Sequence, residues 1–209
     1  SQFLQNNDGE WEPLLQTALE QGINFFETAP TYNASDFWKT GDGKSLDSSE
    51  QRYGRILSEH RDKIVLSTKL PGRDVDGAKR SLEKSLKNFR TDYVDVLMIH
   101  GVTKDDDISV IEKGLYKTML SFKESGVVKN IGFSCMNDPE HGRDLLEELD
   151  FDVTLVAMNE TKYGGFAETI LPAARKKNVG VVAMKVMRDL VGEAATAKEL
   201  LEYAWTQDG

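Results

Sequence analysis

The sequence predicts an α/β fold built around a parallel sheet. Short apolar runs rich in Val, Ile and Phe alternate with segments whose apolar residues recur with the period of a helix. The apolar runs are nearly continuous, which is typical of strands that are covered on both faces. Successive runs are about 30 residues apart, which is the length expected of a βα unit.

The alternation places each element in turn. We expect strands at residues 24–29, 64–70, 93–100, 130–135, 153–159 and 179–187. We expect helices at about residues 11–21, 48–60, 78–89, 108–125, 139–149, 168–177 and 194–207. The strands are rich in β-branched and aromatic residues, whereas the helices carry the longer charged side chains.

Several helices also carry start signals. Pro139 stands where the first turn of a helix tolerates proline. Ser48 or Ser49 can cap the second helix, with Glu50 close behind. The acidic run at 105–107 precedes another helix, and negative charge is favourable at a helix N-terminus.

Two architectures fit this order of elements, an open doubly wound sheet and an eight-stranded barrel. The chain opens on a helix with no strand before it and closes on a helix with no strand after it. An open nucleotide-binding sheet would also carry a glycine-rich turn after its first strand, but residues 24–29 lead into Pro-Thr-Tyr-Asn. We therefore predict a single (β/α)8 barrel domain over residues 1–209, with its first and last strands absent from this chain.

Composition excludes several classes of protein. The chain has 209 residues, is 39% hydrophobic and carries a formal net charge of −9, which is unlike a nucleic-acid-binding surface. Its single cysteine, Cys135, excludes an intrachain disulfide. No apolar run approaches the roughly 20 residues of a membrane span. We expect a cytoplasmic protein, with a cleaved export leader as the alternative.

In βα barrels the chemistry lies at the C-terminal ends of the strands, and here those ends are polar. The residues concerned are Glu27 with Tyr32 just beyond it, Lys69, His100, Ser134, Cys135, Asn159, Glu160, Lys185 and Arg188. A buried lysine without a partner would cost several kcal/mol, so we expect Lys69 to pair with an acid.

Four of these residues have complementary chemistry. A tyrosine phenol has a pKa near 10, and a nearby ammonium lowers it by favouring the phenolate. Lys69 would act in this way on Tyr32, and Glu27 would hold Lys69 charged. His100 would orient a carbonyl oxygen toward the phenol.

The motifs ETAPTY, STKL and LMIHG, on successive βα units, resemble the aldo-keto reductase superfamily. SSEQRYGRIL, GVVKNIGFSC and VGVVAMK extend the resemblance over essentially the whole chain, and it is strongest to a branch whose members often bear export signals. The resemblance implies that Tyr32 is the general acid, Lys69 its pKa modulator and His100 the carbonyl-orienting residue. Glu27 stands where the family has aspartate. The implied reaction is hydride transfer from NADPH, or from NADH, to a small-molecule aldehyde or ketone.

The resemblance also implies a set of cofactor-binding residues. They are Ser134, Asn159, Met184, Lys185 and Arg188. Four positions depart from the family pattern. One is Met184, which replaces an aromatic residue that stacks on the nicotinamide. Glu27 is longer by one methylene, Cys135 replaces an asparagine, and Leu155 replaces a glutamine.

Two other functions stay open at this point. Lys69 could form a Schiff base, as in lysine-dependent aldolases, which require a neutral amine. The departures at the cofactor-binding positions would also suit a nicotinamide-binding regulatory barrel with little turnover. Metal hydrolysis is disfavoured, because His60 and His141 fall on or beside helices and no metal-binding histidine pair is present. The sequence predicts neither the substrate nor the oligomeric state.

Overall fold

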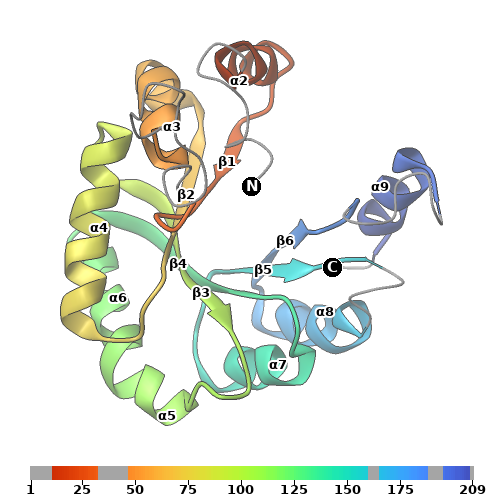
Figure 1. Cartoon of the computed structure of the whole chain (residues 1–209). Coiled ribbons are helices and arrows are strands. Elements are labelled where there is room, and N and C mark those ends of the chain that lie inside the picture. Colours follow the sequence, from red (N-terminus) through yellow and green to blue (C-terminus); the bar gives the residue numbers. More distant parts are fainter. Residues whose placement is uncertain (1–10, 33–46, 160–164, 188–194, 208–209) are drawn as a thin grey trace, which may run out of the picture.

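The computed structural model describes residues 11–32, 47–159, 165–187 and 195–207. Six parallel strands form one sheet in which spatial order follows chain order. They are β1 (Phe25–Glu27), β2 (Val65–Leu70), β3 (Val94–Val102), β4 (Val128–Cys135), β5 (Val153–Ala157) and β6 (Gly180–Met184). Figure 1 shows these strands curving around a common centre, with β1 and β6 at the two edges of the described sheet. The predicted α/β barrel architecture is confirmed, with six of its strands among the described residues.

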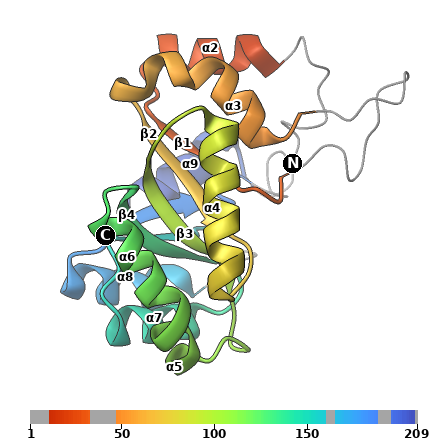
Figure 2. The ribbon, with the colours of Figure 1, turned by 90° about the vertical axis from the view of Figure 1, so that its left-hand side faces the viewer.

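Helices cover the outside of the strands (Figure 1), and the perpendicular view shows α3, α4 and α6 along one side of them (Figure 2). The α-helices are α2 (Trp11–Glu20), α3 (Ser49–Leu57), α4 (Val75–Phe89), α5 (Ile108–Ile111), α6 (Lys117–Glu124), α7 (Pro139–Glu148), α8 (Phe166–Lys177) and α9 (Ala197–Trp205). A 3₁₀-helix, η1 (Ser58–Lys63), follows α3, and a π-helical turn, η2 (Glu112–Tyr116), joins α5 to α6. The helices expected at 48–60 and 108–125 are therefore each divided into segments with different hydrogen-bond patterns.

The caps explain where two helices begin. Ser48 caps α3 in a reciprocal capping box with Gln51, whereas Glu50 is fully buried and takes no part in it. Asp107 caps α5 by accepting from two backbone N–H groups. The acidic run at 105–107 thus supplies the cap of α5, as predicted, and the Asp106 carboxylate pairs with Arg73.

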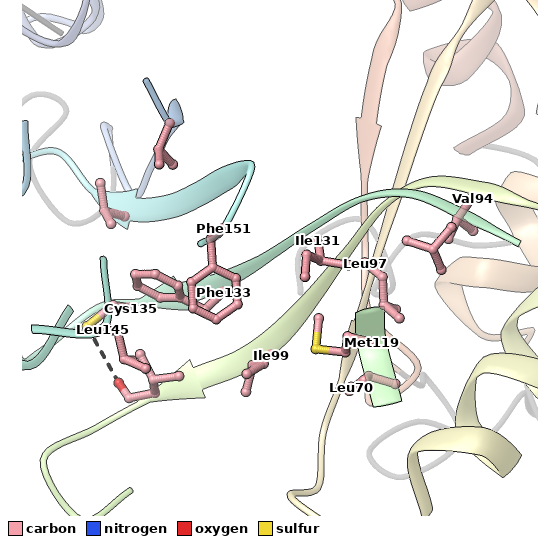
Figure 3. Close-up of a cluster of buried hydrophobic side chains, with 14 of the residues drawn as sticks. Leu70, Val94, Leu97, Ile99, Met119, Ile131, Phe133, Cys135, Leu145 and Phe151 are labelled. Carbon is pink, nitrogen blue, oxygen red and sulfur yellow. Dashed lines mark hydrogen bonds between the residues drawn. The ribbon is translucent and has the colours of Figure 1, made fainter. Parts of the chain in front are cut away.

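The larger core lies between the strands and the helices. Outward-facing side chains of β3 and β4 pack there against residues from α6 and α7 (Figure 3). Leu97, Ile99, Ile131 and Phe133 come from the strands, and Met119 and Leu145 from the helices. Because successive strand residues point to opposite faces, the residues between these point into the barrel.

The inward-facing residues form a second, smaller apolar cluster. Val96, Met98, Val153 and Leu155 are its buried members, and Met184 is packed against them. Leu155, which by the resemblance replaces a glutamine of the family, thus lies in an apolar layer. Alternation along β3 puts His100 on this same inward face, two residues beyond Met98, above the apolar layer.

Candidate active site

The loop after β1 is attached to the helix that follows it. The Tyr32 N–H donates to the Ala29 carbonyl at 3.0 Å, which closes a turn, and the Tyr32 carbonyl accepts from Ser49 N–H at 3.0 Å. The Tyr53 hydroxyl, from α3, donates to the Glu27 carbonyl at 3.2 Å. These bonds hold the backbone of both predicted site residues, Glu27 and Tyr32, against α3.

Lys69 is almost completely buried near the end of β2, with 2% of its side chain exposed. Its ammonium forms an ion pair with the Glu27 carboxylate, as the sequence predicted. The same ammonium donates to the Thr28 carbonyl at 3.0 Å. Two acceptors therefore compensate for the removal of this group from water.

Tyr32 lies between this ion pair and His100. The Lys69 ammonium is 5.1 Å from the centroid of the Tyr32 ring, within the range of a cation–π contact. The rings of Tyr32 and His100 meet edge to face, with centroids 5.8 Å apart and planes at 80°. The structure thus brings together the four side chains that the sequence singled out, Glu27, Tyr32, Lys69 and His100.

Burial controls the titration of this cluster. It raises the pKa of Tyr32 above its ordinary value. The direction is opposite to the lowering that was expected from Lys69, because removal from water disfavours the phenolate. Burial also lowers the pKa of Lys69 to about 7, and the positive charge of Lys185 adds to this shift. The Glu27 carboxylate acts in the opposite direction, since it stabilises the charged lysine.

His100 is neutral at pH 7. Its pKa is lowered to about 4, first by burial and then by the positive charges of Lys69, Arg73 and Lys185. A neutral imidazole carries one N–H donor and one acceptor nitrogen, so it can donate a hydrogen bond without holding a full charge.

The residues predicted to bind a cofactor lie on β4, β5 and β6. Ser134 is buried, and its hydroxyl accepts from Gly101 N–H at 2.8 Å and donates to the Ile99 carbonyl at 3.4 Å. The Asn159 amide donates to the backbone carbonyls of Lys185 and Val186, at 3.2 Å each. Both side chains thus support the ends of neighbouring strands.

The end of β6 carries the remaining predicted cofactor residues. Met184 is half-buried beside the inner apolar cluster. Lys185 follows with a left-handed backbone, φ 62°, and its charge acts on both Lys69 and His100. Arg188 and Glu160 lie outside the described residues.

Sequence reasoning missed two features beside the site. Arg73 contacts the end of β3, although it stands in a loop after β2 and no motif marks it. Behind the site, buried Glu50 accepts from the Thr68 hydroxyl at 2.8 Å and from the Asn88 amide at 3.0 Å. No sequence signal marked Glu50 as buried, because glutamate is almost always exposed.

Two other kinds of site are absent from the described ranges. No group of three or more His, Cys, Asp or Glu side chains there is arranged to hold a metal ion. Among the same residues, no helix is both long enough and apolar enough to cross a membrane.

The model of the Aldo/keto reductase family matches residues 2–198 of the chain. The chain belongs to the aldo/keto reductase family. The Glu27 carboxylate, which the resemblance sets in the place of the family's aspartate, reaches Lys69 in this structure.

Individual aldo/keto reductases and related enzymes are distant in sequence. The chain is 25% identical over 185 residues to the uncharacterised oxidoreductase YqkF of Bacillus subtilis, a match that covers 81% of this chain and 53% of the relative. It is 29% identical over 139 residues to the methylglyoxal reductase DkgA of Yersinia pestis, covering 66% of this chain and 44% of the relative. The chain thus spans about half the length of these curated relatives.

The fold is also that of solved family members. The aldo/keto reductase from Klebsiella pneumoniae, solved in complex with NADP and acetate, superposes with a TM-score of 0.66 at 19% identity. The match covers 83% of this chain and 56% of that one. At this identity the likeness establishes the fold of the chain.

Proposed function

We propose that the protein is an NADPH-dependent reductase that converts a small aldehyde or ketone to an alcohol, with Tyr32 as the proton donor. The observation that carries this proposal is the position of the Tyr32 ring, between the Lys69 ammonium at 5.1 Å and the His100 ring at 5.8 Å. Membership of the aldo/keto reductase family supports the reaction class. NADPH is preferred to NADH because a solved member of the family holds NADP.

Each of the four side chains has a separate role in the proposed reaction. His100, neutral at pH 7, donates its N–H to the substrate carbonyl oxygen and holds that oxygen near the Tyr32 hydroxyl. Tyr32 then gives its proton to the oxygen as negative charge develops there. The Lys69 ammonium stabilises the phenolate that remains, and Glu27 holds this ammonium charged and in place.

The residues at the other strand ends fit a dinucleotide. When bound, a reduced nicotinamide supplies the hydride that the carbonyl carbon receives. Lys185 places a positive charge close to Lys69 and His100. A bound anionic group such as a diphosphate would reduce the repulsion between these positive charges. Met184 offers a polarisable apolar surface beside the inner cluster, and Asn159 holds the loop that carries Lys185.

The deciding experiment is NADPH consumption with a reactive aromatic aldehyde, measured for the protein and for Tyr32→Phe. We expect the variant to bind NADPH normally but to lose turnover by at least about 100-fold, the usual contribution of a general acid. Tyr93→Phe is the matched control, since Tyr93 lies just before β3, at the opposite end of that strand from His100. Equal rates for the protein and Tyr32→Phe would refute the assignment.

One observation favours a second function. Burial lowers the pKa of Lys69 to about 7, and a partly neutral buried amine is what a Schiff-base lyase needs. The Glu27 ion pair opposes this use, because it favours the charged lysine. Borohydride trapping of a carbonyl compound on Lys69, without any requirement for Tyr32, would establish this alternative in place of the reductase.

A further inference from the structure

Arg73 joins three segments around the end of β3. It lies in the loop between β2 and α4, next to the α4 cap residue Asp74. Its Nη1 and Nη2 donate to the carbonyls of His100 and Gly101 at 3.1 and 3.2 Å. Its Nε and Nη2 form a two-point contact with the Asp106 carboxylate at 2.7 and 2.8 Å.

These contacts replace strand pairing that β3 loses at this point. The register between β3 and β4 shifts between Ile99 and Val102, which marks a bulge. Gly101 adopts a left-handed backbone there, φ 62°, and its N–H donates to the Ser134 hydroxyl. Arg73 accordingly satisfies two carbonyls of the bulge and Ser134 satisfies one N–H group. Bulges beside active sites commonly re-aim a side chain.

The side chain that this bulge aims is His100. Its backbone carbonyl is held by Arg73, while its ring meets Tyr32 edge to face. Asp106 in turn accepts from Thr103 N–H at 2.9 Å. The carboxylate that binds Arg73 is therefore fixed to the loop that directly follows β3. A rigid guanidinium fork can satisfy carboxylate and carbonyl groups together, which a lysine ammonium cannot reproduce.

We propose that Arg73 is a positioning residue for the reduction, which sets the ring of His100 against the substrate oxygen by clamping the β3 bulge to Asp106. This inference rests on the proposed function in one respect, that His100 contacts the carbonyl. Ser134 supports the same bulge from β4, so it is a positioning residue as well as a predicted neighbour of the nicotinamide.

Arg73 also acts on His100 through its charge. Among the described residues, the charged or titratable groups that act on or contact His100 are Lys69 from β2, Arg73 from the following loop, Lys185 after β6 and Tyr32 from the loop after β1. Glu27 and Asp106 neutralise Lys69 and Arg73 in part. Burial is the first cause of the low pKa of His100, and the positive charge of Arg73 contributes to it.

The test compares two variants with a control. Arg73→Lys keeps the charge and removes the fork. We expect kcat for the aldehyde to fall about tenfold or more, since misplacement by 1 Å can cost about 100-fold, while KM for NADPH changes little. Arg143→Lys is the matched control, because Arg143 forms an exposed pair with Asp144. It should leave both constants unchanged.

The second variant, Arg73→Met with Asp106→Asn, removes both charges of the clamp. The imidazole titration of His100 is followed by NMR and assigned with His100→Gln. We expect its midpoint to rise from about 4, because the charge of Arg73 acts on the ring more strongly than the charge of Asp106, which is lost with it. A wild-type kcat in Arg73→Lys together with an unchanged His100 midpoint would overturn the inference. The titration needs no turnover, so an inactive wild-type protein would refute the reductase proposal and still leave Arg73 testable.

Discussion

Lys69 donates a hydrogen bond of 3.0 Å to the carbonyl of Thr28, the residue directly after the glutamate with which it forms an ion pair. The lysine of β2 is thus attached to the end of β1 by both a backbone and a side-chain acceptor. A residue held in this way keeps its charge at a defined distance from the Tyr32 ring, which is the property the proposed mechanism needs.

Replacement of Lys69 affects both catalysis and stability. Lys69→Met keeps the volume of the side chain and removes the ammonium that stabilises the Tyr32 phenolate. We expect kcat to fall by about 100-fold or more. The free energy of unfolding should also fall, by about 2–4 kcal/mol, because the substitution leaves the Glu27 carboxylate and the Thr28 carbonyl without their shared partner. Aldehyde turnover and urea unfolding measure the two effects, and an unchanged stability would contradict the role given to the ion pair.

The Glu27 carboxylate reaches the Lys69 ammonium directly. Glu27→Asp withdraws the carboxylate from the Lys69 ammonium by roughly 1.5 Å, one carbon–carbon bond. We expect turnover to fall, by up to about 100-fold, despite the usual aspartate of the family. Steady-state kinetics with NADPH and the same aldehyde test the change. An unchanged or higher rate would show that the pocket accepts either acid.

His100 makes stability depend on pH in weakly acidic solution. Its pKa is about 4 in the folded protein, below the ordinary value of 6.5, so between these values the unfolded chain binds more protons. Stability contributed by neutral His100 is therefore present above about pH 6.5 and is lost as pH falls toward 4. We expect His100→Gln to flatten the dependence of unfolding free energy on pH in this window. Parallel curves for the two proteins from urea unfolding would contradict this account.

Glu50 stabilises the layer behind the site. Its buried carboxylate accepts from Thr68, the neighbour of Lys69, and from Asn88 of α4. Glu50→Ala leaves both donors without this partner, and we expect a loss of about 2–4 kcal/mol in unfolding free energy. Glu59→Ala, at an exposed position of η1, is the control and should change stability by less than about 0.5 kcal/mol. Equal midpoints for the two variants in urea would show that Glu50 is not a structural residue.

The order of the elements could be predicted because each depends on local patterns. The six described strands lie in apolar runs rich in β-branched or aromatic residues, and Ser48 begins α3 through contacts within four residues of the chain. The boundaries inside longer segments were not predicted. A π-helical turn at 112–116 interrupts the helix expected at 108–125, and β3 runs past His100 to Val102.

The chemical groups at the strand ends can be predicted from the order of residues, because a parallel sheet places every C-terminal end at one edge. Glu27, Lys69 and His100 follow from that rule alone. How these groups titrate, and which contacts hold them, depends on the folded arrangement of the chain. The raised pKa of Tyr32 depends on how much water the surrounding residues exclude. The clamp of Arg73 on His100 joins residues 27 positions apart in the chain, a contact that exists only after β2 and β3 have paired.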